Sequence, residues 1–259
     1  MFASERMQKI RQILFEYKKA DVSKLSEILS VSEVTIRKDL ERLEEENFLT
    51  RTHGGAILSE NASAENSYNI MPIPEIDHKK TIGIIGAQMI NNNEAIFIGS
   101  GTTCLQLARN LKDKKNVTVI TNNVSVAVEL SNISTLKVIL TGGNIKNDEY
   151  TQSVYGPSTI RAIQDIYVDK AFIGVNGISF KRGYTIHDED YLNISNEISK
   201  YTNELIVLAD NTKFNKIALS QLGDITLAQK VISDELVPEE YLKFYFENDI
   251  QIFTTYKFS

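Results

Sequence analysis

Residues 29–44 of the chain read LSVSEVTIRKDLERLE, and this stretch decides the fold of the N-terminal region. Apolar residues recur in it at the three- and four-residue spacing of an amphipathic helix, and Ser32 stands before them as an N-cap. We therefore predict a helix from about 34 to 46. The side of this helix that faces the core carries Ile36, Leu40 and Leu43. Another side carries the polar residues Thr35, Lys38 and Arg42.

Two further helices are predicted before this one. The first runs from Arg6 to Tyr17, and the apolar residues of its buried stripe are Met7, Ile10, Ile13, Leu14 and Tyr17. The second is shorter, runs from about Ser23 to Leu29, and buries Leu25, Ile28 and Leu29. Because only residues 30–32 separate the second and third helices, the two form a helix-turn-helix. The stretch 49–57, LTRTHGGAI, is strand-like with a Gly-Gly turn and predicts a wing.

The predicted third helix carries the groups that bind double-stranded DNA. Lys38 and Arg42 can bond phosphates or guanine edges, and Thr35 can contact a thymine methyl group or a backbone oxygen. Residues 44–46 are all glutamate and are repelled by phosphate, so the helix enters the major groove with its N-terminal end first. The wing adds candidates for phosphate or minor-groove contact. The predicted DNA-binding residues are Ser32, Thr35, Arg37, Lys38, Arg42, Arg51, His53 and Gly54.

The composition is that of an ordinary globular protein. Of the 259 residues 42% are hydrophobic and 24% are charged, and this length suits a small module plus one larger domain. The single cysteine, Cys104, cannot form an internal disulfide or a multi-cysteine metal site, so we expect no metal and a reducing compartment. No run approaches the roughly 18 apolar residues of a membrane span, and the N-terminus lacks the apolar stretch of a signal peptide. We expect a cytoplasmic protein.

The net charge is −6, which excludes a protein that coats nucleic acid non-specifically through a strongly basic surface. Residues 1–57 contain ten Lys and Arg against ten Asp and Glu, so the whole excess of negative charge belongs to the remainder. DNA binding by the first region must therefore depend on where its cations lie.

A linker and a second domain follow the wing. Residues 58–75 are rich in Asn, Ser, Ala and Pro and predict a linker. Beyond it, short apolar runs alternate with helix-length segments, as in a mostly parallel sheet with helices on both faces. The predicted strands are 95–98, 117–121, 136–140, 170–175, 205–209 and 250–253. The predicted helices lie at about 79–90, 103–111, 124–130, 158–166, 191–202 and 238–247. We predict an α/β chain with domains at 1–57 and 76–259.

Glycine, hydroxyl and amide residues gather where the predicted strands end. The first strand runs into Gly99–Thr103, a turn that opens a helix and aims backbone N–H groups at one point, which suits phosphate. Ligands of parallel sheets bind outside the carboxyl ends of the strands, so the segments after the later strands are expected to join it. The predicted effector-binding residues are Gly99, Ser100, Gly101, Thr102, Thr103, Asn122, Asn123, Gly142, Gly143, Asn176, Gly177, Asp210 and Lys213.

Several of these residues have a purely structural alternative. The glycine-rich turn can simply reverse the chain, Asp210 can cap the turn that follows it, and Lys213 can be an ordinary surface lysine. Cys104 is more often a small buried apolar residue than a reactive thiol. Each charge on the third helix can also belong to a solvated face.

Residues 29–44, together with 51–56, resemble the N-terminal winged module of the DeoR family of bacterial regulators. The segments that resemble the C-terminal domain of that family, in order and spacing, are 98–103, 120–123, 140–143, 168–177, 183–185 and 209–214. The resemblance implies a Rossmann-like α/β effector domain related in fold to ribose-5-phosphate isomerase and glucosamine-6-phosphate deaminase. It also implies a sensor of phosphorylated sugars or related metabolites.

The chain departs from the family pattern in both domains. The family usually has two arginines where this chain has Arg37 and Lys38, and a lysine lacks the bidentate fork of arginine. Many relatives have an acidic residue at the position of Gly99. They also have a Glu and a Lys in the helix that here supplies Leu192, Ser195 and Asn196. We therefore expect an unusual effector, even if phosphate recognition by residues 100–103 is kept.

We expect a sequence-specific transcription regulator, a repressor of carbohydrate metabolism genes that is controlled by a phosphorylated sugar or related metabolite. Its expected partners are a DNA operator, this effector and further copies of itself in a homodimer or homotetramer, with no cofactor and no membrane. Two alternatives stay open. One is a sugar-phosphate isomerase or deaminase, which needs a positioned base, and the intact DNA module argues against it. The other is a DNA-binding protein whose larger domain only oligomerises.

Overall fold

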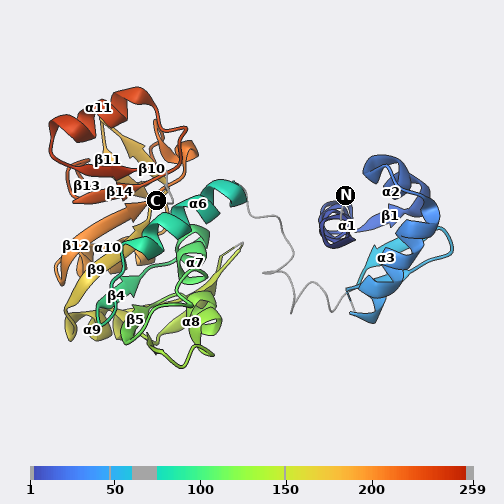
Figure 1. The fold of residues 1–259 in the computed structure, drawn as a ribbon, viewed down its shortest axis with the longest axis horizontal. Helices are drawn as coiled ribbons and strands as arrows, with labels where there is room; N and C mark the ends of the chain where they lie inside the picture. The colour runs from blue at the N-terminus through green and yellow to red at the C-terminus, as the bar shows by residue number, and fades with distance from the viewer. Residues whose placement is uncertain (1–2, 47, 60–74, 149, 255–259) are drawn as a thin grey trace. The chain divides into compact units, whose positions relative to one another are not determined.

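The structure is a computed structural model that describes residues 3–46, 48–59, 75–148 and 150–254. The chain divides into two compact units, Met1–Pro74 and Glu75–Ser259 (Figure 1). Most of the predicted linker, 58–75, lies outside the described residues. The predicted domain limits at 57 and 76 stay predictions.

In the described part of the first unit, three helices pack with a small antiparallel sheet. The helices are α1 (Ala3–Tyr17), α2 (Val22–Leu29) and α3 (Glu33–Glu45). The strands lie side by side in the order β1 (Lys19–Asp21), β3 (Gly55–Leu58) and β2 (Leu49–Arg51). The three predicted helices and the wing are therefore confirmed. The strand β1 is missed because its three residues are too few to show a period.

Gly55 allows the wing to lie against β1. A Cβ atom at this position would come within 2.0 Å of the carbonyl oxygen of Ala20, whereas a Cβ on Gly54 would meet nothing within 4 Å. The two glycines therefore differ in their physical roles. Gly55 is required by the close approach of two strands, and Gly54 lies in the turn between β2 and β3.

Two side chains that we predict to be buried are exposed. Tyr17 is the last residue of α1 and is 63% exposed, and Ile28 of α2 is also 63% exposed. The buried face of α2 is set by Val22, Leu25 and Leu29. At about 100° per residue, Ile28 falls to one side of that face. The prediction was wrong at both positions because the spacing alone does not give the width of the covered face.

A buried ion pair ties α1 to α3. The Arg6 guanidinium donates from Nε to Asp39 Oδ2 at 2.5 Å and from one terminal nitrogen to Oδ1 at 3.1 Å. The Arg6 side chain is 10% exposed and the Asp39 side chain 3%. Because the two bonds are parallel, they fix the angle as well as the distance between the helices. The packed apolar residues around them include Ile10, Leu14, Ile36 and Leu40.

A seven-stranded parallel sheet forms the centre of the larger unit. Its strands lie in the order β15 (Gln251–Phe253), β14 (Lys230–Ile232), β12 (Thr202–Leu208), β9 (Val168–Gly174), β4 (Ala95–Ile98), β5 (Val117–Thr121) and β6 (Leu136–Leu140). Every neighbouring pair is parallel. All carboxyl ends therefore lie at one edge of the sheet.

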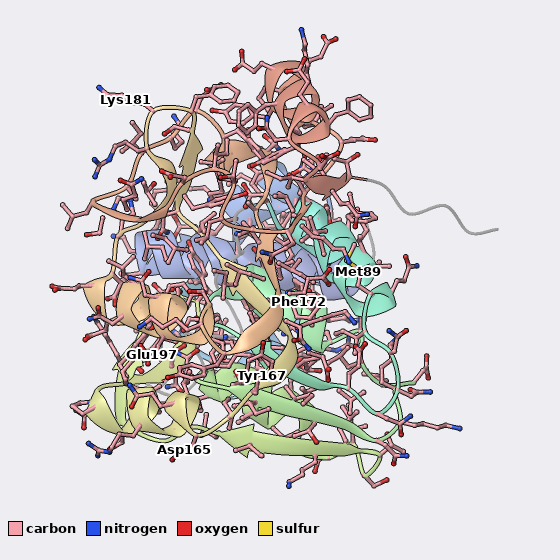
Figure 2. All side chains as sticks on the ribbon, turned by 90° about the vertical axis from the view of Figure 1, so that its left-hand side faces the viewer. Met89, Asp165, Tyr167, Phe172, Lys181 and Glu197 are labelled. Carbon is pink, nitrogen blue, oxygen red and sulfur yellow. The ribbon has the colours of Figure 1, made fainter. Side chains whose placement is uncertain are left out.

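Helices cover both faces of this sheet, as predicted. One face packs on α6 (Ile76–Gln88), α7 (Thr102–Ala108) and α8 (Val124–Leu130), and the other on α9 (Pro157–Gln164), α10 (Glu189–Ile198) and α11 (Glu239–Glu247). Adjacent residues of β4 lie on opposite faces of the sheet. Ile96 belongs to the core that includes α6, α7 and α8, and Phe97 belongs to the core that includes α9, α10 and α11. Phe172 lies fully buried within the sheet, whereas Tyr167, just before β9, is exposed (Figure 2).

The order of the strands reverses beside β4. From β4 the chain adds β5 and β6 on one side, and it then returns to place β9, β12, β14 and β15 on the other. The carboxyl ends of β4 and β9 therefore flank a topological switch point, where the loops separate and leave room for a ligand. This places residues 99–103 where a binding site is expected.

The six strands predicted for the larger unit are confirmed, and three groups of short strands are missed. The first is β14, which lies between β12 and β15 in the main sheet. The second is the hairpin of β7 (Asn144–Asn147) and β8 (Gln152–Tyr155), and the third is the small sheet of β10 (Gly177–Ser179), β11 (Gly183–Ile186) and β13 (Ser220–Gly223). Strands of three or four residues depend on distant partners. No helix in the described ranges combines the length and apolar character needed to cross a membrane.

The Arg6–Asp39 pair can be tested by removing one charge. Asp39→Asn leaves the guanidinium of Arg6 buried without a counter-charge, and we expect the free energy of unfolding of the first unit to fall by about 3 kcal/mol. Urea unfolding followed by circular dichroism measures this change. Glu33→Gln is the matched control because it breaks an exposed pair with Arg37 on the same helix, and it should cost less than about 0.5 kcal/mol. Equal losses in the two variants would contradict the assignment.

Candidate functional site

The turn before α3 is built from three serines. Ser30 adopts the left-handed conformation with φ 53°, and it ends α2. The Ser26 hydroxyl donates to the carbonyl oxygen of Val31 at 2.6 Å. Ser32 then caps α3, because its Oγ accepts from the backbone N–H of Thr35 at 3.3 Å and lies 2.9 Å from the hydroxyl of Thr35. The predicted cap is confirmed, and the two hydroxyls at the start of the helix bond to one another.

The cations of α3 fall into two kinds. Arg37 pairs with Glu33 at 3.3 Å, and both side chains are half exposed. Lys38 and Arg42 are exposed, and within the described ranges neither has a hydrogen-bond or ion-pair partner. Their charges are therefore available to phosphate without breaking an existing pair.

The wing is held to the acidic end of α3. The backbone N–H of Arg51 donates to Glu44 Oε1 at 2.9 Å, and the Arg51 guanidinium lies 3.9 Å from Glu41 Oε1. His53 and Gly54 are exposed in the turn between β2 and β3. All eight predicted DNA-binding residues thus lie in one unit, on α3, its cap and the wing. Arg51 and Glu41 partly neutralise each other.

In the larger unit, three polar side chains converge behind the turn that follows β4. Asn122 Nδ2 donates to Ser100 Oγ at 2.8 Å and to the carbonyl oxygen of Val154 at 3.3 Å. The Tyr155 hydroxyl, which comes from the hairpin, donates to the same Ser100 Oγ at 3.2 Å. Asn122 is fully buried, and its Oδ1 has no hydrogen-bond partner among the described residues. This oxygen is therefore a buried acceptor for which the described residues supply no donor.

Gly101 shapes the turn itself. It has φ 97° and N-caps α7, a backbone conformation that side chains rarely tolerate. Thr102 is buried and Thr103 half-buried in the first turn of that helix. Cys104, which follows, is fully buried, and burial raises the pKa of its thiol to about 12. The structure therefore makes Cys104 a packing residue.

A buried lysine that we did not single out lies in the same unit. Lys79 is in the first turn of α6 and only 7% exposed, and among the described residues its ammonium has no hydrogen-bond or ion-pair partner. Burial lowers the pKa of Lys79, and the nearby Asp210 carboxylate opposes that shift. Lys79 lies three and four residues before Ile82 and Gly83, which are buried on α6. This helical spacing is the sequence signal that could have predicted the burial of Lys79.

Asp210 and Lys213 follow the end of β12, and both act electrostatically on the ammonium of Lys79 in α6. Asp210 is fully buried, and its Oδ1 accepts from the backbone N–H of Thr212 at 3.1 Å, so it caps the turn. Its Oδ2 has no hydrogen-bond partner in the described ranges and lies 3.7 Å from Lys213 Nζ. The structural alternative for Asp210 therefore holds for one oxygen and leaves the other available. Since only β9 separates β12 from β4, the carboxyl ends of those two strands are about 10 Å apart.

Tyr191 accounts for the glycine at position 99. A Cβ there would come within 2.6 Å of the Tyr191 hydroxyl, which accepts from the backbone N–H of Gly174 at 3.1 Å. The N–H of Gly99 itself donates to the carbonyl oxygen of Phe172 at 2.9 Å. Burial raises the pKa of Tyr191 well above its ordinary value, so the phenol stays neutral. Its hydroxyl occupies the space into which a side chain at position 99 would extend.

Other predicted effector residues lie at the same edge but serve the fold. Asn123 caps α8 by accepting from the N–H of Val126 at 3.2 Å, and exposed Asn176 accepts from the N–H of His187 at 3.0 Å. Gly142 and Gly143 have positive φ, and a Cβ on Gly143 would come within 2.5 Å of the Tyr155 carbonyl oxygen. A Cβ on Gly177 would meet the carbonyl oxygen of Lys216 at 2.5 Å. These contacts do not require a ligand.

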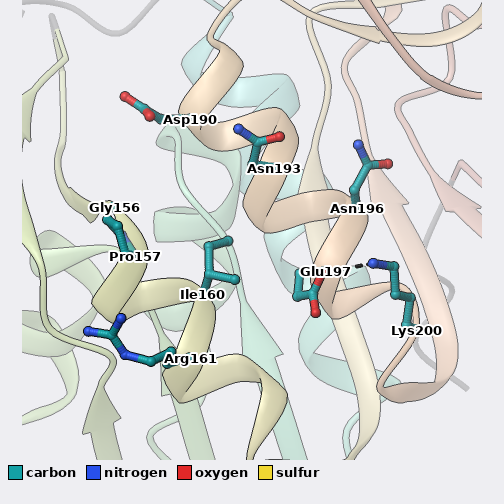
Figure 3. A pocket seen from close by; sticks show the side chains of 9 residues that line it. All are labelled: Gly156, Pro157, Ile160, Arg161, Asp190, Asn193, Asn196, Glu197 and Lys200. Carbon is teal, nitrogen blue, oxygen red and sulfur yellow. Dashed lines mark hydrogen bonds and ion pairs between the residues drawn. The ribbon is translucent and has the colours of Figure 1, made fainter.

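A cleft lies between α9 and α10 (Figure 3). Its volume is about 550 Å³, and its lining residues include Arg161, Asn193, Asn196, Glu197 and Lys200. Lys200 donates to Glu197 at 2.8 Å, and Arg161 donates to Ser158 at 3.3 Å. Because the carboxylates of Asp190 and Glu197 line the same cleft, it offers a weaker attraction for an anion than the cluster around Lys79.

Comparisons with known proteins match both units to one family. Residues 6–62 match the model of the DeoR-like helix-turn-helix domain, and residues 75–235 match that of the DeoR C terminal sensor domain. The chain is 32% identical to the HTH-type transcriptional regulator GolR of Listeria innocua, over 94% of this chain and 95% of that protein. It is 30% identical to the HTH-type transcriptional repressor GlcR of Bacillus subtilis, over 98% and 97%.

Solved structures resemble the larger unit only distantly. Ribose 5-phosphate isomerase A of Methanocaldococcus jannaschii has a TM-score of 0.38 and 14% identity, and the match covers 54% of each chain. A likeness of this degree does not bear on the chemistry of the present site.

The contact between positions 99 and 191 gives a stability prediction. Gly99→Ala should lower the free energy of unfolding by about 2 kcal/mol because its methyl group overlaps the Tyr191 hydroxyl. Tyr191→Phe removes that oxygen, so the double variant should lose less than the sum of the two single losses. Thermal and urea unfolding of the four proteins measures the coupling. Strictly additive losses would show that the hydroxyl of Tyr191 does not exclude a side chain at position 99.

Proposed function

The chain belongs to the DeoR family of transcriptional regulators, and on that premise we propose that it represses genes of carbohydrate metabolism until a phosphorylated sugar or related metabolite binds its sensor domain. A protein of this family is a DNA-binding regulator and not an isomerase or deaminase. The proposal concerns the ligand, the residues that bind it and the direction of control.

The buried ammonium of Lys79 is the observation that carries the proposal. Removing a charge from water without a partner costs several kcal/mol, so buried lysines are normally paired. The single carboxylate of Asp210 acts on both Lys79 and Lys213, so an anionic ligand would supply the counter-charge that the two lysines together still lack. A phosphate group with two negative charges suits two lysines.

The neighbouring acceptors favour a ligand that also carries hydroxyl groups. Asn122 Oδ1 and Asp210 Oδ2 are buried and accept no hydrogen bond from the described residues. Both need donors, and the hydroxyls of a sugar are donors. Ser100 adds a hydroxyl at the switch point between them. A phosphate ester of a polyhydroxylated carbon chain supplies the anion and the donors in one molecule.

The DNA-binding half of the proposal rests on α3 and the wing. We infer that Lys38 and Arg42 bind phosphates, because they are exposed and have no partner within the described ranges. One module buries too little surface for tight specific binding, so a homodimer or homotetramer is expected to present modules to repeated half-sites. GlcR of Bacillus subtilis is named a repressor, which favours repression as the direction of control.

Linkage sets a condition on the control mechanism. If the effector weakens DNA binding, then DNA must weaken effector binding by the same factor. If the larger unit only oligomerised, it would bind no effector, and this mutual weakening of DNA and effector binding would not be observed.

The phosphate contacts are tested by salt dependence. Lys38→Ala and Arg42→Ala should each weaken operator binding and reduce the slope of log K against log salt by about 1, since each loses one phosphate contact. Fluorescence anisotropy with labelled operator at several salt concentrations gives both quantities. Lys24→Ala, which removes an exposed lysine of α2, serves as the control and should keep the wild-type slope. An unchanged slope in Lys38→Ala and Arg42→Ala would remove these residues from the interface.

The effector site is tested with two adjacent lysines. Sugar phosphates should raise the melting temperature of the wild-type protein, because a ligand that prefers the folded state stabilises it, and the free sugars should not. Lys79→Met should abolish this shift. In the absence of ligand it should raise the free energy of unfolding by about 1–2 kcal/mol, because an unpartnered charge is removed.

Lys80→Met is the matched control for that experiment. Lys80 is exposed and pairs with Asp77 at 3.0 Å on the same helix, so its loss should leave the ligand-induced shift unchanged. If Lys79→Met destabilises the protein and keeps the shift, Lys79 is not the anion contact. If no phosphorylated metabolite shifts the wild-type protein, the larger unit does not sense this class of ligand.

A further inference from the structure

An apolar side chain stands on the exposed face of α3. Val34 is 65% exposed, although its neighbours on this face are polar or charged. The residues that bury α3 in the module are Ile36, Asp39, Leu40 and Leu43. At about 100° per residue, Val34 points to the side opposite these four, together with Lys38 one turn later. It contributes nothing to the core of the module.

Val34 also lies close to the N-terminus of α3. It lies in the first turn, directly after the Ser32 cap and Glu33. The acidic residues of α3 and its C-cap are concentrated at the other end, where Glu44 and Glu46 bond to Arg51 and Arg11. Phosphate repels that end, so the first turn is the part of α3 that approaches the bases. Val34 is therefore at the leading end of the helix.

Thr35, which we expect to contact a thymine methyl group or a backbone oxygen, is less exposed than Val34. It is half-buried, and its hydroxyl lies 2.9 Å from Ser32 Oγ in the cap. At about 100° per residue it lies more than a quarter turn from Val34, whereas Lys38 lies about 40° from Val34. Its hydroxyl already serves the start of the helix, whereas the methyl groups of Val34 have no partner of their own.

Among the base edges of the major groove, only thymine presents an apolar group, its 5-methyl. Polar edges would lose hydrogen bonds to water against the methyl groups of a valine, with nothing in return. We propose that Val34 contacts the 5-methyl group of one thymine in each operator half-site and thereby selects thymine at that position. This inference rests on the proposed function, in which α3 enters the major groove.

Replacement of thymine by uracil tests the contact, because uracil differs only in lacking the methyl group. Duplexes that bind the full-length protein are first selected from a random-sequence library, and each thymine of the selected half-site is then replaced in turn. At one position, uracil should weaken wild-type binding by about four-fold per half-site, the fold-change expected for the burial of one methyl group. At the other thymines it should have little effect.

Two variants make the assignment specific. Val34→Ala should bind the thymine and uracil duplexes equally at that position, while it keeps its circular dichroism spectrum, since alanine favours a helix more than valine does. Ile28→Ala is the matched control, because Ile28 is an equally exposed apolar residue of the same module, on α2. It should keep the wild-type preference for thymine.

Two results would overturn the proposal. One is a Val34→Ala protein that still loses affinity at the same thymine, and the other is a wild-type protein that is indifferent to uracil at every position. Both are distinct from a failure of the proposed function, in which the wild-type protein would select no duplex at all and both proposals would fall.

Discussion

In the first unit, the guanidinium of Arg6 and the carboxylate of Asp39 are both removed from water and bond to each other through two atoms. A single-point contact would let α3 rotate about its own axis, but a bidentate pair does not. The faces of α3 follow from this constraint. With Asp39 held inward, the apolar stripe packs on the module core, and Lys38 and Arg42 are left in solvent.

The buried charge of Lys79 in the larger unit differs from that of Arg6, because no described carboxylate forms a hydrogen-bonded pair with it. Lys79 is slightly more buried than Arg6, yet among the described residues its ammonium has no hydrogen-bond or ion-pair partner, and Asn122 Oδ1 and Asp210 Oδ2 accept no hydrogen bond at the same edge of the sheet. In the first unit a buried charge holds the fold. In the second, we propose that the charge and the acceptors receive a ligand, as the sensor domain of the proposed function requires.

The glycine at position 99 shows how two distant residues define a site together. The Tyr191 hydroxyl occupies the volume that a side chain at 99 would need, so the switch point carries a neutral phenol and no carboxylate. We infer that the ligand must find its polar contacts in Ser100, Asn122 and Tyr155 and in the cluster around Lys79. This difference from the usual family pattern is the physical basis for expecting an uncommon effector.

The sequence by itself determined the elements whose signals are local. The cap at Ser32, the helical period of α3 and the long apolar runs of the central strands each lie within a few consecutive residues, and the structure confirms them. Only the tertiary structure decided which of two adjacent lysines, Lys79 or Lys80, is buried, why position 99 is glycine, and where Ile28 and Val34 point. The reason is physical: burial and close contact depend on what packs against a residue from elsewhere in the chain. The sequence gives the period of a helix but not the width of the surface that covers it.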